Sequence, residues 1–148
     1  MTLSRLKEKN GVYKMNSYII DTVAFLAYLA DVLPRKADEI FKKAEKKQVK
    51  LLLPSIALGE SLYTIYKGKE IFGKVIPLEK IELIFQILRD QDILELICLN
   101  LEGWRLFHGL EISELHDRMI VASLKLFKAE AILTNDSEIS EGISTIWD

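Results

Sequence analysis

Four acidic residues are spaced along the chain so that an α/β fold would direct their side chains toward one pocket. They are Asp21, Glu60, Asp117 and Asp136. Carboxylates gathered without basic partners repel one another, so such a group normally needs a cation to hold it together. Hard divalent ions such as Mg²⁺ prefer oxygen ligands and can make a bound water acidic enough to attack a phosphodiester. The leading hypothesis from these residues is therefore a metal-dependent phosphodiesterase.

Two of the acids follow apolar runs that we expect to be strands. Asp21 comes directly after the run 18–20, and Asp136 follows the run 131–135. In an open parallel sheet, ligands bind beyond the carboxyl ends of the strands, where the connections separate to opposite faces. Each aspartate could instead only cap the helix after it, because Asp is a favoured N-cap residue. For either aspartate alone, capping is the more ordinary interpretation.

The third aspartate, Asp117, occurs in a predicted helix over 113–128 that is apolar on two sides, with Leu115 among the residues opposite to it. Such a helix is expected to be largely buried, and an ionised carboxylate inside it needs a partner. An ion pair with Arg118, with Lys125 or with a distant residue would be the structural alternative. We favour a metal ion as the partner.

Two glutamates are further candidates. Glu114 precedes Asp117 by three positions and shares its face of the helix, so it could supply a second carboxylate. Acidic residues are also common in first helical turns because of the helix dipole alone. Glu60 lies in a predicted helix over 55–67, on a stripe that also carries Lys67, so a solvated helix surface competes with a site role.

The elements that must position these residues alternate between short apolar runs and longer helical patterns, which is typical of βα units around a parallel sheet. The expected strands cover 17–20, 49–53, 93–98 and 130–134, with 143–146 as an edge strand. The expected helices cover 22–31, 34–48, 55–67, 78–91, 100–109, 113–128 and a short segment from about 136. Gly68 and Gly73 bracket a predicted turn.

Composition restricts the class of protein. A chain of 148 residues, 49% of them hydrophobic, can bury the core of one compact domain. We expect residues 1–15 to be an N-terminal extension and residues 16–148 to form the single domain. The net charge of -2 excludes a broad cationic surface, so any contact with nucleic acid must come from local basic groups or from metal ions.

Several classes of site and location are disfavoured. The single cysteine, Cys98, lies in the apolar run 93–99 and is predicted to be a small buried residue. No intrachain disulfide is possible, and two histidines with one cysteine are too few for a zinc finger. The longest apolar stretch, 23–30, is far shorter than the roughly 20 residues that span a bilayer. A soluble cytoplasmic protein is therefore expected.

Taken together, these residues resemble the PIN domain family of ribonucleases, which includes the VapC-like toxins of toxin–antitoxin pairs. The resemblance extends from about Tyr18 to Ile146. Its parts are a strand ending in Asp21-Thr22, Pro54-Ser55 with Glu60 on the next helix, Leu115-His116-Asp117-Arg118-Met119-Ile120-Val121-Ala122, and Ile132-Leu133-Thr134-Asn135-Asp136. The order and spacing of these parts make the resemblance more specific than any one of them.

The resemblance implies a three-layer α/β/α fold with a central parallel sheet of four to five strands. It also implies an endoribonuclease site that depends on Mg²⁺ or Mn²⁺. The metal-binding and catalytic acids would be Asp21, Glu60, Asp117 and Asp136. Thr22 and Thr134 would support the site through their hydroxyl groups, and Asn135 or Glu138 would add ligands through water. The implied partners are RNA, a second copy of the chain in a homodimer and, in the toxin branch, a small antitoxin.

One segment departs from the family pattern, because 68–91 is longer and more apolar than in a minimal toxin. We expect it to complete the core, with a dimer surface as the alternative. Four basic residues could guide a phosphate backbone: Lys67, Lys69, Arg105 and Arg118.

Two other functions are compatible with parts of the pattern. A PIN-like module that has lost catalysis would bind RNA or a protein. The presence of all four acids argues against such a loss of catalytic activity. A haloacid-dehalogenase-like phosphohydrolase would use Asp21 as its nucleophile. Enzymes of that class have a strand followed by Asp-x-Asp, whereas in this chain Val23 occupies the position of the second aspartate.

Overall fold

The computed structural model describes residues 5–7, 13–137, 139 and 142–148 of the chain. Its centre is a five-stranded sheet in which all neighbouring strands are parallel, in the order β7-β4-β3-β8-β9. The strands are β3 (Ser17–Ile20), β4 (Lys50–Pro54), β7 (Leu94–Ile97), β8 (Ala131–Leu133) and β9 (Thr145–Ile146). All five expected strands are therefore present, each within two residues of its predicted ends.

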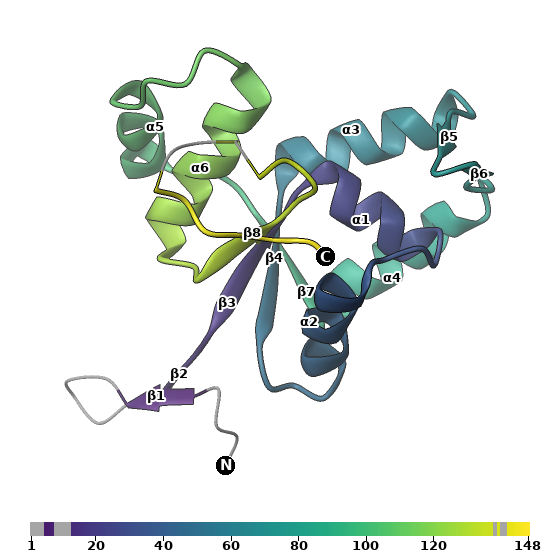
Figure 1. Cartoon of the computed structure of the whole chain (residues 1–148), viewed down its shortest axis with the longest axis horizontal. Helices are drawn as coiled ribbons and strands as arrows, with labels where there is room; N and C mark the ends of the chain where they lie inside the picture. Colours follow the sequence, from purple (N-terminus) through teal and green to yellow (C-terminus); the bar gives the residue numbers. More distant parts are fainter. Residues whose placement is uncertain (1–4, 8–12, 138, 140–141) are drawn as a thin grey trace.

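Six helices occur in the described residues and cover the sheet on both faces (Figure 1). Those on one face are α1 (Thr22–Leu29), α2 (Arg35–Glu45), α3 (Ser55–Tyr66) and α4 (Lys80–Asp90). Those on the other face are α5 (Leu101–His108) and α6 (Leu115–Phe127). The predicted three-layer α/β/α fold is confirmed.

Alternating side chains of the central strand join the sheet to both layers. Ile20 packs into the hydrophobic core shared with α1 to α4, whereas Ile19 packs into the second core with Ile120 and Val121 of α6. Both strand residues are fully buried. Successive side chains of a strand point to opposite faces, so Ile19 and Ile20 meet apolar surroundings on the two sides of the sheet.

The order of the strands reverses at β3. From β3 the chain moves outward to β4 and β7, then returns through α5 and α6 to β8 on the other side of β3. The carboxyl ends of β3 and β8 therefore lie side by side, and the backbone N–H of Asp21 donates to the carbonyl of Leu133 at 3.2 Å. A reversal of this kind leaves a crevice in which α/β proteins bind ligands.

Two antiparallel hairpins lie outside this sheet: β1 (Arg5–Lys7) with β2 (Tyr13–Met15), and β5 (Glu70–Ile71) with β6 (Lys74–Val75). The second one turns at Phe72 and Gly73, whose φ angles are 50° and 80°. Two adjacent positive φ angles are the signature of a tight two-residue hairpin turn. The turn predicted between Gly68 and Gly73 is present, but strands of two residues were too short to be recognised.

Two other expectations have different outcomes. The prediction that Cys98 is buried is wrong, because the residue is exposed. It follows β7, an edge strand of the sheet, and Leu96, two residues earlier, is itself 40% exposed. The short helix expected from about 136 falls partly on 138, 140 and 141, which lie outside the described residues.

In the described ranges, no helix has the length and apolar character needed to cross a membrane.

Candidate active site

Asp21 follows β3 and caps α1, because its Oδ1 accepts a hydrogen bond from the backbone N–H of Ala24 at 3.0 Å. The capping interpretation is therefore correct, but it does not account for the electrostatic surroundings of the residue. Asp21 is only 7% exposed, and burial raises the pKa of its carboxyl to about 6. Hydrogen bonds from Thr134 and Ala24 and the proximity of His116 lower this pKa, whereas the charge of Asp117 raises it.

Glu60 extends from α3 toward the beginnings of α1 and α6. The Thr22 hydroxyl donates a 2.7 Å hydrogen bond to its Oε1. The Nδ1 atom of His116 lies 2.5 Å from the same oxygen but forms no hydrogen bond in this orientation. The Glu60 side chain is 47% exposed, so it is partly solvated. These contacts bring the beginnings of α1 and α6 to the middle of α3.

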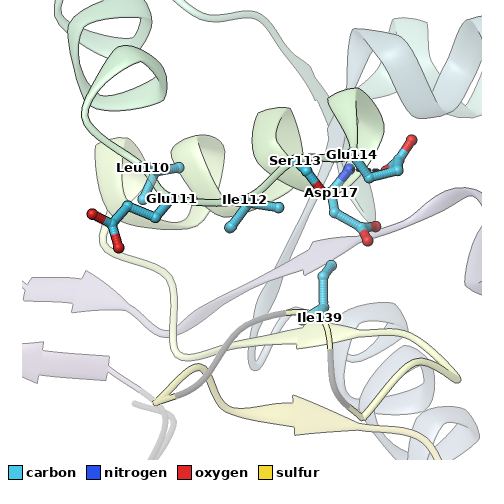
Figure 2. A pocket seen from close by; sticks show the side chains of 7 residues that line it. All are labelled: Leu110, Glu111, Ile112, Ser113, Glu114, Asp117 and Ile139. Carbon is cyan, nitrogen blue, oxygen red and sulfur yellow. Dashed lines mark hydrogen bonds between the residues drawn. The ribbon is translucent and has the colours of Figure 1, made fainter.

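Glu114 and Asp117 form the beginning of α6. Both Glu114 oxygens accept backbone hydrogen bonds, Oε1 from His116 at 3.1 Å and Oε2 from Asp117 at 2.7 Å. These bonds, chiefly the one from Asp117, lower the pKa of Glu114. In Figure 2 the Glu114 carboxylate stays beside the first turn of the helix, whereas the Asp117 carboxylate points toward Ile139. Glu114 thus fixes the turn that carries Asp117.

The pKa of Asp117 depends on the other acids of the site. Its pKa is raised, first by burial and then by the negative charges of Glu114, Asp136 and Glu60, and only His116 opposes them. The expectation that both sides of this helix are buried is wrong at its beginning, where Leu115 is 59% exposed. The buried residues of α6 start one turn later, at Ile120. The first turn therefore extends beyond the packed part of the helix, and Asp117 reaches solvent.

Arg118 is not the partner of Asp117. Its guanidinium donates to the carbonyls of Phe107, His108 and Ile112 at 2.8, 3.0 and 3.3 Å, and it lies 4.9 Å from the Phe107 ring centroid. In the described part of the chain, no lysine or arginine forms an ion pair with Asp21 or Asp117. The ion-pair alternative is therefore wrong for every lysine and arginine that the structure describes. Arg118 instead binds carbonyls at the end of α5 and in the segment after it.

The residues after β8 complete the arrangement. Thr134 is buried at 1% exposure, and its Oγ1 accepts a hydrogen bond from the backbone N–H of Asp136 at 3.1 Å. The same residue influences the Asp21 carboxyl. Thr134 therefore connects the ends of β3 and β8. Asn135 and Asp136 are exposed, and Glu138 lies outside the described residues.

The donor chemistry of this cluster fits a hard divalent cation, because Asp21, Glu60, Asp117 and Asp136 offer only oxygen ligands. In the described residues, no three histidine, cysteine or acidic side chains lie close enough together to hold a metal ion as they stand. The acids interact electrostatically without converging on one point. Repulsion between carboxylates opposes convergence in the absence of a cation, and the partly exposed side chains of Glu60 and Asp117 have room to turn.

A cavity of about 490 Å³ opens beside Asp117 (Figure 2). Its walls are Leu110, Glu111, Ile112, Ser113, Glu114, Asp117 and Ile139. The segment between α5 and α6 supplies most of this lining, and Arg118 holds that segment through its bonds to the carbonyls of His108 and Ile112. The Asp117 carboxylate therefore lies in the wall of this cavity.

His116 belongs to this site, although the sequence analysis gave it no role there. It was considered only as one of two histidines that are too few for a zinc finger and as part of the segment 115–122. Its ring reaches Glu60, and its charge, when present, stabilises the carboxylates of Asp21, Glu114 and Asp117. The available signal was its position directly before Asp117. No local pattern pairs it with Glu60, which is 56 positions earlier in the chain.

Comparison with known protein families gives one match, in which the sequence model of the PIN domain covers residues 18–142. Comparison with curated proteins gives no match. The matched range contains all four acids, all of β4, β7 and β8, and β3 from its second residue onward.

Three solved structures are similar in fold. VapBC2 from Rickettsia felis, bound to a DNA fragment from its promoter, superposes with a TM-score of 0.65 at 18% identity, covering 89% of this chain and 99% of that chain. VapC20 of Mycobacterium tuberculosis, described as a sarcin-ricin loop cleaving toxin, gives a TM-score of 0.58 at 13% identity, covering 88% of this chain and 99% of that chain. A toxin–antitoxin complex from Klebsiella pneumoniae gives a TM-score of 0.56 at 14% identity, covering 87% of this chain and 95% of that chain.

Proposed function

Because this chain belongs to the PIN domain family, we propose that it is a metal-dependent endoribonuclease that hydrolyses phosphodiester bonds of RNA. The observation that carries this proposal is the set of contacts that brings acids from separate elements together. Thr22, directly after Asp21, and His116, directly before Asp117, both contact Oε1 of Glu60. The negative charges of Glu60 and Asp136 add to the raised pKa of Asp117. No lysine or arginine in the described residues neutralises Asp21 or Asp117, so a divalent cation is the partner that these two carboxylates need.

Asp21, Glu60, Asp117 and Asp136 would hold Mg²⁺ or Mn²⁺. When bound, the ion would acidify a water molecule and offset the negative charge of the phosphate. Thr22 would orient Glu60 through its hydroxyl group, and Thr134 would orient Asp21 and the backbone of Asp136. Glu114 would position Asp117 through its two bonds to the first turn of α6, and Asn135 would add a contact through water.

We further propose that the chain acts as a cytoplasmic VapC-like toxin that forms a homodimer and is paired with a small antitoxin. The support is the similarity in fold to one chain from a toxin–antitoxin complex and to one toxin described as cleaving the sarcin-ricin loop. A catalytically silent PIN-like module remains the competing function. The same assay separates the two, because the silent module would bind RNA without cutting it.

The test is cleavage of a labelled single-stranded RNA by the purified chain in Mn²⁺, in Mg²⁺ and in chelator. We expect cleavage only with a metal ion and its loss in Asp117→Asn. The matched control is Glu111→Gln, which removes the same charge from an exposed position of the same cavity and should retain activity. Equal cleavage by wild type and Asp117→Asn, or cleavage that persists in chelator, would contradict the proposal.

A further inference from the structure

Tyr63 of α3 is an exposed aromatic side chain that two lysines approach. Its side chain is 55% exposed. The Nζ atoms of Lys67 and Lys69 lie 5.5 and 5.6 Å from the centroid of its ring. The buried face of α3 is formed instead by Ala57, Ser61 and Ile65, so packing of the core does not explain this tyrosine. An exposed ring with cations close by is the combination that binds single-stranded nucleic acid.

This group lies on the same side of α3 as Glu60. Residues separated by three, four and seven positions share one face of a helix, which aligns Glu60 with Tyr63 and Lys67. The rise of a helix places the backbone of Tyr63 about 5 Å and that of Lys67 about 10 Å along the axis from Glu60. In Figure 1, α3 runs from the carboxyl end of β4 toward β5. The group therefore leads away from the acids along one helix.

We propose that Tyr63 is a stacking platform for one base of the RNA substrate, and that Lys67 and Lys69 contact the flanking phosphates. This inference rests on the proposed ribonuclease function and names how the same site would hold its substrate. At 3.4 Å per stacked nucleotide, the platform would lie about one to three nucleotides from the metal-binding acids. It would supply the local basic contact that a chain of net charge -2 requires.

The existing contacts of the ring do not prevent stacking. An exposed cation–π contact favours association by a factor of only about 2 to 5. Stacking of a base on an aromatic side chain favours it by a factor of about 5 to 150. A base would therefore displace an ammonium group from the ring face, and the displaced lysine, on its flexible stem, would remain within reach of the adjacent phosphates.

The experiment measures the affinity for a fluorescent single-stranded RNA in chelator, and the cleavage of the same RNA in Mn²⁺. We expect Tyr63→Leu to weaken binding about 5- to 100-fold and Tyr63→Phe to bind like wild type. The matched control is Phe85→Leu, because Phe85 is an exposed aromatic residue, 41% exposed, on the separate helix α4 and should be neutral. Removing Lys67 and Lys69 as Lys→Gln should reduce the slope of log Kd against log salt by about 0.7 for each lysine.

The outcomes distinguish this inference from the ribonuclease proposal. Wild-type cleavage together with unchanged RNA affinity in Tyr63→Leu would overturn the platform and leave the ribonuclease proposal intact. RNA binding that depends on Tyr63 without metal-dependent cleavage would support the platform and overturn the nuclease. A wild-type chain that neither binds nor cuts RNA would overturn both. Because Tyr63 is exposed, its variants should unfold at the wild-type temperature in each case.

Discussion

The hydroxyl group of Thr22 donates a hydrogen bond of 2.7 Å to Oε1 of Glu60, which joins the first turn of α1 to the middle of α3. Thr22 directly follows the buried Asp21, so the two metal-binding candidates are connected through adjacent residues of one helix start. The bond restricts a glutamate that is otherwise half exposed. A bond that holds a site residue in position contributes more to the reaction rate at the site than to the stability of the whole fold.

Thr22→Val should therefore lower RNA cleavage more than it lowers stability. We expect kcat/KM to fall about tenfold, because Glu60 loses the group that orients it. The free energy of unfolding should fall by only about 0.5–1.5 kcal/mol, the usual net value of one hydrogen bond. The matched control, Thr22→Ser, retains the hydroxyl group and should retain activity. Denaturation by urea and cleavage assays measure the two effects, and equal activity of Thr22→Val and wild type would remove this role.

The pH dependence of stability should report the buried Asp21. Its pKa is about 6 in the folded chain and 3.8 as the ordinary value, so the folded state binds more protons than the unfolded state between these pH values. The contribution of Asp21 to stability in chelator is then fully present below about pH 4 and is lost as the pH rises through 6. The loss attributable to Asp21 amounts to about 2–3 kcal/mol.

Asp21→Asn tests this assignment, because asparagine caps a helix as well as aspartate does but has no charge to bury. We expect the variant to be more stable than wild type in chelator at pH 7 and to show a smaller fall in stability between pH 4 and 7. Thermal unfolding across this range is the measurement. If the unfolding temperatures of wild type and variant changed in parallel with pH, the Asp21 carboxyl would have its ordinary pKa and the assignment would be wrong.

Relief of repulsion should be visible in Asp117→Asn. The pKa of Asp117 is raised by burial and by neighbouring acids, so its ionised form is unfavourable in the folded chain without a cation. In chelator, the variant should unfold at the same or a higher temperature than wild type. In Mn²⁺, wild type should gain stability by mass action, whereas the variant should gain much less. Glu111→Gln is the control, and a similar Mn²⁺ response in all three proteins would argue against a site at Asp117.

Arg118 should act on stability and not on RNA affinity. Arg118→Gln removes charged donors from three backbone carbonyls, which we expect to cost about 2–4 kcal/mol. The slope of log Kd against log salt for RNA should not change, because the guanidinium is already occupied. Lys125→Gln is the matched control and should be neutral for stability, since Lys125 is exposed. A shallower salt dependence in Arg118→Gln would instead indicate a phosphate contact.

Much of the fold could be predicted because local signals determine it. The apolar run of β3 and its Asp21-Thr22 ending indicated a buried parallel strand before a helix, and the same logic located β8. The proximity of Asp21 and Thr134 also followed, because adjacent parallel strands end at one edge of a sheet. Burial of Asp21 and its place at the helix start therefore agree with the pattern of the sequence.

Contacts between distant side chains could not be predicted in this way. Nothing in the local sequence pairs His116 or Thr22 with Glu60, since these contacts depend on how α1, α3 and α6 pack. Exposure of Leu115 and Cys98 depends on where a helix or an edge strand extends past its neighbours. The use of Arg118 as a donor to three carbonyls depends on the path of the chain after α5.

The central claim is that acids remote in the sequence share a divalent cation, and an anomalous difference map from a crystal soaked in Mn²⁺ tests it most directly. We predict a Mn²⁺ peak coordinated by carboxylate oxygens of both Asp21 and Asp117, with Glu60 or Asp136 turned toward it. A map without a peak at these residues under saturating Mn²⁺, or one in which the ion contacts a single acid, would contradict the account.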